Sequence, residues 1–184
     1  MAIKLIKPVE VYRNKFAVLY DDEVEFPNGS HGRYVRFCWA APYGVALRVV
    51  NSDDALLLIR TFRHDSRCWT WQVPKGFGVD GLTPLACAQK ELREETGLEA
   101  SGWCHAHTYY EGSIDVHAFD ARVEGAAMAL DFDNNEAGEV INAARFVSRA
   151  ECAAIVAAAR PELDGDPVLD LISVISLQQF ASGR

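Results

Sequence analysis

The stretch from residue 83 to residue 98 constrains the fold most, because it carries signals for both ends of a helix. Thr83 and Pro84 form a helix start: the hydroxyl can cap free backbone N–H groups, and proline tolerates the first helical position. Gly97 supplies a left-handed C-terminal stop. The sequence therefore predicts a helix over roughly residues 84 to 96. Apolar residues recur at helical period and form its expected buried stripe: Leu85, Ala88 and Leu92.

One face of this predicted helix carries acidic side chains. Glu91, Glu94 and Glu95 stand at i, i+3 and i+4, so they share an arc of about a third of a turn. Carboxylates at this spacing repel one another. One interpretation is a solvated face on which Lys90, four residues before Glu94, offsets the repulsion. The other is a hard-cation site, because clustered carboxylate oxygens suit Mg²⁺ or Mn²⁺.

The segment from residue 76 to residue 98 resembles the Nudix box, G-x5-E-x7-R-E-U-x-E-E-x-G-U, where U is aliphatic. Gly76 matches the first glycine, and ELREETGL matches the second half. Two positions depart, since Leu82 replaces the glutamate and Lys90 replaces the arginine. The resemblance implies a Mg²⁺ site, with Mn²⁺ as a second possible metal. Its expected ligands are Glu91, Glu94, Glu95 and the backbone carbonyl of Lys75, and Glu94 is also expected to be catalytic.

Alternating and continuous apolar runs on both sides of this helix predict strands. The expected strands cover residues 9–20, 23–26, 34–40, 43–50, 55–63, 69–74, 103–110, 116–123 and 139–148. The run 43–50 is nearly continuous in apolar residues and is expected at the centre of the sheet. Ser148 and Glu151 form a capping box that starts a helix reaching about residue 160. Asp166 and Pro167 are expected to open the last helix.

This order of elements predicts the α/β class, and the resemblance narrows it to the Nudix α/β/α sandwich with a mixed sheet. We expect a Nudix hydrolase domain over residues 41–184 and an N-terminal β-strand extension over residues 1–40. The resemblance to ADP-ribose pyrophosphatase-like members implies that this extension helps to form a homodimer.

Two arginines end one of the expected strands. The guanidinium groups of Arg60 and Arg63 suit diphosphate oxygens, and the run LLLIRTFRHD resembles ADP-ribose pyrophosphatase-like members in a way that favours Arg63. The Lys75 ammonium is a further candidate for a phosphate contact, or it faces solvent. Glu139 and Glu136, in an acidic loop before a strand, are candidates for a catalytic carboxylate, and Glu139 also for a metal ligand.

The resemblance implies Mg²⁺-dependent hydrolysis of a nucleoside diphosphate derivative, ADP-ribose or a nucleotide sugar, to a nucleoside monophosphate and a sugar phosphate. Two alternatives stay open. Pro74-Lys75-Gly76 resembles diadenosine polyphosphate hydrolases, and the departures at Leu82 and Lys90 fit a Nudix-like module that binds a nucleotide without cleaving it. The substrate markers that relatives carry after the box are missing, because Ile114, Asp115 and Val116 stand there.

Charge narrows the class of partner. A formal net charge of −8 and a pI near 5.1 argue against nucleic acid and anionic membranes, because both require a basic surface. A small, metal-chelated nucleoside diphosphate derivative is compatible with this charge. The N-terminal residues lack an apolar signal-peptide core and no run reaches membrane-spanning length, so we expect a cytoplasmic location.

Overall fold

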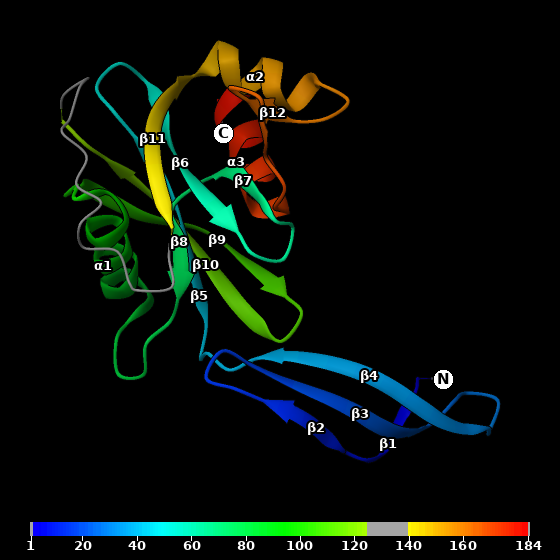
Figure 1. The fold of residues 1–184 in the computed structure, drawn as a ribbon. Coiled ribbons are helices and arrows are strands. Elements are labelled where there is room, and N and C mark those ends of the chain that lie inside the picture. The colour runs from blue at the N-terminus through cyan, green and yellow to red at the C-terminus, as the bar shows by residue number, and fades with distance from the viewer. Residues whose placement is uncertain (1, 125–139, 184) are drawn as a thin grey trace.

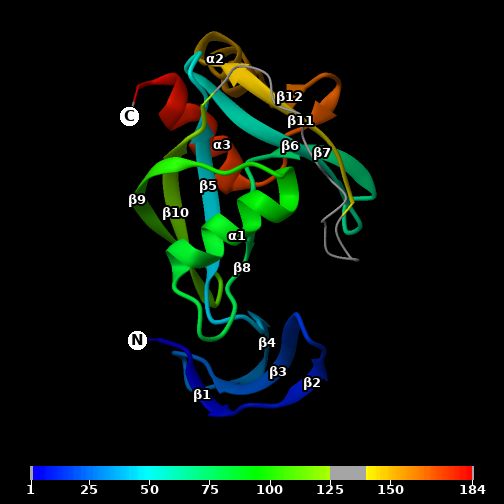
Figure 2. The same cartoon turned by 90° about the vertical axis from the view of Figure 1, so that its left-hand side faces the viewer.

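A mixed sheet between helical layers forms the body of the protein in the computed structural model, which describes residues 2–124 and 140–183 (Figure 1). The main strands lie in the order β11 (Ile141–Ser148), β6 (Ala55–Arg63), β5 (Gly44–Val50), β10 (Ile114–Arg122) and β9 (Ser101–Glu111). Strands β5 and β10 are parallel, and the other neighbours are antiparallel. Helix α1 (Pro84–Thr96) covers one face, and α2 (Arg149–Ala157) and α3 (Leu171–Ala181) cover the other (Figures 1 and 2). This confirms the predicted α/β/α sandwich.

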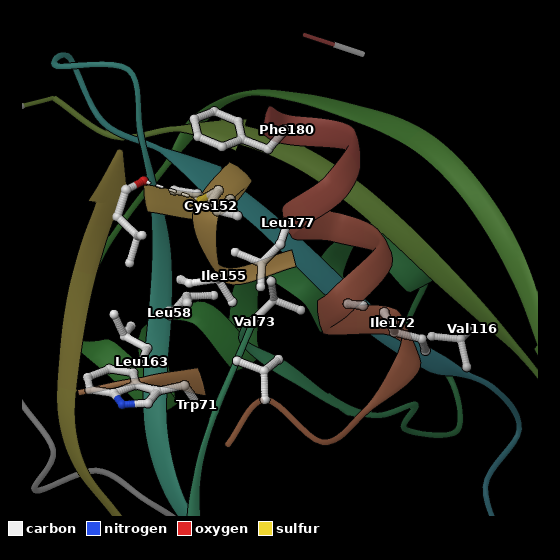
Figure 3. Packing of buried hydrophobic residues seen from close by; sticks show 14 of the residues in the cluster. Leu58, Trp71, Val73, Val116, Cys152, Ile155, Leu163, Ile172, Leu177 and Phe180 are labelled. Atoms are coloured by element: carbon white, nitrogen blue, oxygen red, sulfur yellow. Dashed lines mark hydrogen bonds between the residues drawn. The ribbon is translucent and has the colours of Figure 1, made fainter. Parts of the chain in front are cut away.

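Strand β5 is buried on both faces, as its continuous apolar run predicts. Val45, Leu47 and Val49 join the apolar cluster under α1, whereas Ala46 joins the cluster under α2 and α3. This alternation follows from the period of two residues along a strand. Figure 3 shows the cluster under α2 and α3, in which Leu58 of β6 and Val73, just after β7 (Cys68–Gln72), meet Ile155, Leu177 and Phe180 from the helices. The sheet is thereby fixed between its two helical layers.

Just before α1, the chain passes from a strand that pairs with β6 to a strand that pairs with β5. Strand β7 pairs with β6, and β8 (Lys75–Phe77) pairs with β5, both antiparallel. Between them, Pro74 offers no N–H for a sheet hydrogen bond. The short strand β8 was not predicted, and it brings Lys75 and Gly76 beside the acidic helix.

Both predicted ends of α1 are confirmed. The Thr83 hydroxyl accepts the Ala86 N–H at 3.2 Å, and Gly97 has φ of 71° and donates to the Arg93 carbonyl at 2.9 Å. The predicted buried stripe is partly wrong, because Leu85 is 38% exposed. The buried residues are Cys87, Ala88, Glu91, Leu92, Glu95 and Thr96. Two glutamates therefore lie in the middle of the buried face, which apolarity alone could not indicate.

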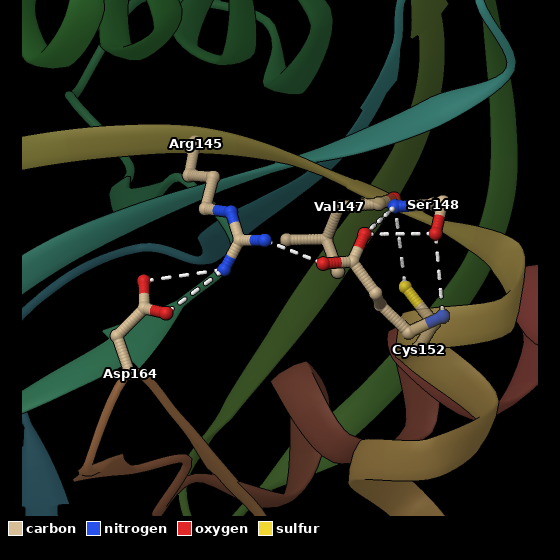
Figure 4. Close-up of polar contacts among 6 residues, drawn as sticks. Arg145, Val147, Ser148, Cys152 and Asp164 are labelled. Carbon is tan, nitrogen blue, oxygen red and sulfur yellow. Dashed lines mark hydrogen bonds and ion pairs between the residues drawn. The ribbon is translucent and has the colours of Figure 1, made fainter.

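Helix α2 begins with the predicted capping box (Figure 4). The Ser148 N–H donates to Glu151 at 3.0 Å, and the Glu151 N–H donates to the Ser148 hydroxyl at 3.3 Å. Beside it, the Arg145 guanidinium pairs with Asp164 at 3.0 Å and also with Glu151. The helix ends at Ala157, earlier than predicted, because Ala158 is extended with ψ of 145°.

The predicted start of the last helix is wrong. Asp166 and Pro167 form the two-residue strand β13 (Asp166–Pro167), which pairs with β12 (Glu162–Leu163). Helix α3 begins later, where the Asp170 carboxylate accepts the Ser173 N–H at 2.9 Å. Among the described residues, no helix has both the length and the apolar character needed to cross a membrane.

Residues 4–39 form a separate antiparallel sheet that projects from the body (Figures 1 and 2). Its strands are β1 (Lys4–Lys7), β2 (Glu10–Arg13), β3 (Ala17–Glu25) and β4 (His31–Trp39), and β3 pairs with each of the others. A turn at residues 27–29 joins β3 to β4, with Gly29 at φ of 82°. Several apolar side chains of this sheet are exposed: Leu5, Val11, Tyr12, Tyr34, Val35 and Phe37.

Candidate active site

Strand β8 turns the backbone of one residue toward α1. The Leu47 N–H donates to the Pro74 carbonyl at 2.9 Å, which marks Pro74 as a bonded position of the ladder between β5 and β8. Because bonded and non-bonded positions alternate along an antiparallel ladder, the N–H and C=O of Lys75 point away from β5. The Lys75 N–H donates to Oε2 of Glu95 at 3.1 Å. The Lys75 carbonyl therefore faces the edge where Glu95 lies.

Glu91 lies against the next residue of the same strand. A Cβ built on Gly76 would meet Cδ of Glu91 at 2.2 Å and Oε2 at 2.3 Å, so a side chain here would displace the carboxylate. Glu91 and Glu95 are 7% and 2% exposed. Burial, followed by the negative charge of Glu91, raises the pKa of the Cys87 thiol, which keeps this neighbour neutral. Two buried carboxylates thus flank the backbone of residues 75 and 76.

Glu94 lies one step away from this pair. Its carboxylate pairs with the Lys90 ammonium on the same helix, as the solvated-face interpretation predicts. Within the described parts of the chain, no three His, Cys, Asp or Glu side chains are grouped closely enough to hold a metal ion. Both partners are part-exposed, and such a helix pair contributes only about 0.2 to 0.5 kcal/mol. Glu94 can therefore leave Lys90 at small cost.

The available donors fit a hard cation. Glu91, Glu95 and the Lys75 carbonyl present oxygen atoms, and rotation of Glu94 would add another carboxylate. Oxygen donors are those that Mg²⁺ and Mn²⁺ prefer. A divalent ion bound by these oxygens would offset the negative charge of the buried carboxylates. The predicted ligand set is therefore chemically suited to such an ion.

Two cavities adjoin β8. The larger measures about 220 Å³ and includes Trp39 and Phe77, whose ring centroids lie 4.9 Å apart. The smaller measures about 90 Å³ and reaches Glu95. Arg63 and Lys75 line both cavities. These two cations therefore lie between an aromatic-walled space and the acidic helix.

The Lys75 side chain is paired with Asp170, the residue that caps the start of α3. Its ammonium lies 3.0 Å from the Asp170 carboxylate, which also caps α3. Burial raises the pKa of Asp170, but the Lys75 charge and the hydrogen bonds from Ser173 outweigh it and leave the pKa below its usual value. The Val73 N–H donates to the Ser173 hydroxyl at 3.0 Å. The start of α3 therefore fixes the strand that leads to the site.

The other candidate residues fall in different places. Arg60 lies outside both cavities, because its guanidinium pairs with Asp166 at 2.6 Å and stacks over Trp69. Glu136 and Glu139 lie outside the described residues. The residue after Glu139, Val140, lines the smaller cavity, and its carbonyl accepts the Phe62 N–H at 2.9 Å.

Three residues of this site were missed as site residues by sequence reasoning. Trp39 belongs to the N-terminal sheet. Its backbone N–H donates to the Ser113 hydroxyl at 2.7 Å, and this hydrogen bond places Trp39 at the larger cavity. Gln72 holds Arg63, and Asp170 holds Lys75. Gln72 carries a signal in the sequence, because it stands two residues before the Pro74-Lys75-Gly76 run. Asp170 and Trp39 carry none, since they are distant from the box in sequence.

Comparisons with known proteins identify the family. The NUDIX domain model matches residues 41–164. An ADP-ribose pyrophosphatase from Bacillus subtilis (strain 168) is 29% identical over 120 residues, which are 63% of this chain and 64% of the relative. A methanol dehydrogenase activator from Bacillus methanolicus is 28% identical over 123 residues, 65% of each chain. An RNA pyrophosphohydrolase from Rickettsia africae (strain ESF-5) is 34% identical over 80 residues, 42% of this chain and 48% of the relative.

These alignments span less than two thirds of the length of each curated relative. A solved structure described as an ADP compounds hydrolase shares the fold, with a TM-score of 0.69 and 16% identity over 100% of this chain and 96% of that one. The family model covers well over half of the sequence. The chain therefore belongs to the Nudix family.

Proposed function

We propose that this protein hydrolyses the diphosphate linkage of a nucleoside diphosphate derivative, ADP-ribose or a nucleotide sugar, in the presence of Mg²⁺. One observation carries the proposal: the buried carboxylates of Glu91 and Glu95 meet the backbone of residues 75 and 76 beside two cavities that share Arg63. The products would be a nucleoside monophosphate and a sugar phosphate, because the broken bond is a phosphoanhydride.

The ligands for Mg²⁺, or Mn²⁺, would be Glu91, Glu94, Glu95, the Lys75 carbonyl and Glu139. A bound ion would neutralise diphosphate charge and lower the pKa of the attacking water. Arg63 would hold a phosphate group through two N–H donors. Glu139 would accept the proton of the water, with Glu136 as the alternative. The position of Val140 at the smaller cavity supports Glu139, its direct neighbour in the sequence.

The larger cavity fits the nucleoside part of such a substrate. The tilted rings of Trp39 and Phe77 offer apolar surface for a base, and Arg63 lies between them and the acidic helix. The net charge of −8 supports a small molecule rather than RNA, because a polyanion needs a basic track.

Two alternative functions make different demands on the same site. A module that binds a nucleotide without cleaving it is favoured by the Lys90–Glu94 pair, which occupies one expected ligand. Diadenosine polyphosphate hydrolysis rests on the resemblance of the Pro74-Lys75-Gly76 run, and within that run the Lys75 ammonium is already paired with Asp170. We therefore rank the diphosphate hydrolase first.

A substrate panel separates these functions. Purified protein with Mg²⁺ is incubated with ADP-ribose, a nucleotide sugar and diadenosine tetraphosphate, and products are separated by chromatography. The proposal expects a nucleoside monophosphate and a sugar phosphate from one of the first two, formed faster than any product of the third. Rapid release of ATP and AMP from the tetraphosphate alone would favour the second enzyme. Binding of all three without turnover would favour the binding module.

We also propose that residues 1–40 form a dimerisation element and residues 41–184 the hydrolase domain. The projecting sheet leaves Tyr34, Val35 and Phe37 exposed at 53%, 64% and 48%. A lone sheet with apolar side chains in water lacks the second layer that sheets normally pack against. A second copy of this chain would supply that layer and give a homodimer.

A further inference from the structure

Arg63 is held by a neutral partner. Its Nη2 donates to Oε1 of Gln72 at 2.7 Å, and the Gln72 side chain is buried, with 4% of the residue exposed. Glu111 lines one of the two cavities that Arg63 enters, and Glu95 lines the other. Within residues 2–124 and 140–183, however, neither they nor any other carboxylate forms an ion pair with Arg63.

Other cations of the body have acidic partners. Arg48 binds Asp120 through two N–H groups at 2.5 and 2.7 Å, and Arg60 binds Asp166 at 2.6 Å. The most informative comparison is Lys75, because it lines the same two cavities as Arg63 but is paired with Asp170 at 3.0 Å. Of these two shared cations, Lys75 is thus neutralised and Arg63 is not.

An amide partner and a carboxylate partner differ in their effect on Arg63, because the hydrogen bond sets its orientation and the charge sets its attraction for an anion. An amide oxygen restricts the orientation of a guanidinium group as a carboxylate does, but it leaves the positive charge in place. In a part-buried site this charge attracts an anion more strongly than in bulk water. A carboxylate at position 72 would compete with the anion for the same guanidinium.

We propose that Gln72 is a positioning residue that aims Arg63 while preserving its charge, so that Arg63 serves as the receptor for the substrate diphosphate. The inference rests on the proposed function, since it assigns the anion at that site. It also assigns phosphate recognition to Arg63 rather than to the Lys75 ammonium.

Two substitutions separate charge from shape. Gln72→Glu keeps a hydrogen-bond acceptor at position 72 but adds a negative charge. Gln72→Leu removes the acceptor and leaves position 72 uncharged. Binding of ADP is measured by titration calorimetry with EDTA present, so that neither metal nor turnover is involved. We expect Gln72→Glu to weaken ADP binding about tenfold or more, and Gln72→Leu only about two- to threefold.

A role in packing or hydrogen bonding alone predicts the reverse order, with Gln72→Glu near wild type and Gln72→Leu weaker. That order would overturn the proposal, and so would a failure of the wild-type protein to bind ADP. Asp166→Asn is the matched control, because it removes the acid from Arg60 on the same strand but outside both cavities. It should leave ADP binding unchanged. Thermal unfolding of each variant checks that the fold is retained.

Kinetics give a second readout with the best substrate of the panel. Gln72→Glu should raise KM by a factor similar to the loss of ADP affinity and change kcat less. If wild-type protein cleaves no substrate but ADP binding follows the expected order, the proposed function fails and this inference stands. If cleavage occurs while Gln72→Glu binds ADP like wild type, this inference fails and the function stands.

Discussion

The carboxyl group of Glu91 lies so close to Gly76 that a methyl group on that glycine would sit 2.2 Å from its carbon. The first glycine of the box and the first glutamate of its helix are therefore in direct contact, although fifteen positions separate them in the sequence. The contact explains why a glycine is needed here: it leaves room for the carboxylate beside the strand.

Gly76→Ala should impair activity much more than stability. The clash is with the end of a flexible side chain, so rotation of Glu91 can relieve it at about 1 kcal/mol. The displaced carboxylate should reduce kcat by about tenfold or more. Gly78→Ala is the control, because its methyl group would meet the Tyr43 ring at 2.5 Å. That variant should lose more stability and less kcat in denaturant unfolding and rate measurements. If Gly76→Ala and Gly78→Ala lose stability and kcat in the same proportion, this role of Gly76 is contradicted.

Lys90→Gln should free Glu94 without harming the fold. The pair that it removes contributes about 0.2 to 0.5 kcal/mol, so the unfolding free energy should change by no more than that. Because Glu94 no longer has to leave Lys90, half-maximal activity should require less Mg²⁺. The measurement is a Mg²⁺ titration of the initial rate. An increased Mg²⁺ requirement would show that Lys90 assists the site instead of competing for Glu94.

Asp170→Asn should change how stability depends on pH. The folded pKa of Asp170 is lowered, so its carboxylate stabilises the fold above its unfolded pKa of about 3.9. This stabilisation is lost as pH falls from that value through the lower folded pKa. Asparagine still caps a helix but does not titrate. Denaturant unfolding between pH 2 and 7 should therefore show that the free energy of unfolding falls less at acid pH in the variant than in wild type. An equal fall in unfolding free energy in both proteins would show that the Asp170 carboxylate does not stabilise the fold.

Sequence reasoning located the elements and the box helix well, because their signals are local. The cap at Thr83 and the stop at Gly97 depend on residues within one turn of each helix end. It failed where the signal comes from tertiary contact. Leu85 was expected inside because it is apolar, yet the buried face of α1 is occupied by Glu91 and Glu95. The pairing of Lys75 with Asp170 joins residues 95 positions apart and has no local pattern.

Val35→Lys should disrupt the proposed homodimer. Val35 is 64% exposed on the projecting sheet, so a charge there should not disturb the fold of one copy but would oppose apolar packing between two. Light scattering after gel filtration should show a dimer for wild type and a monomer for the variant. Leu171→Lys, on a residue that is 76% exposed at the start of α3, should stay dimeric. A monomeric wild-type protein would contradict the proposal.

The most direct test is the Mg²⁺-dependent cleavage of the better of the two proposed substrates, ADP-ribose or a nucleotide sugar, by wild type and by the Glu94→Gln and Glu95→Gln variants, followed by chromatography. We predict that wild type forms a nucleoside monophosphate and a sugar phosphate, that EDTA stops the reaction, and that each variant loses about a hundredfold or more in kcat, roughly 3 kcal/mol of barrier. Glu99→Gln is the control, because Glu99 lies beyond the helix and pairs with Arg93 at its surface. It should retain wild-type turnover. Undiminished turnover in EDTA or in both box variants would contradict the account.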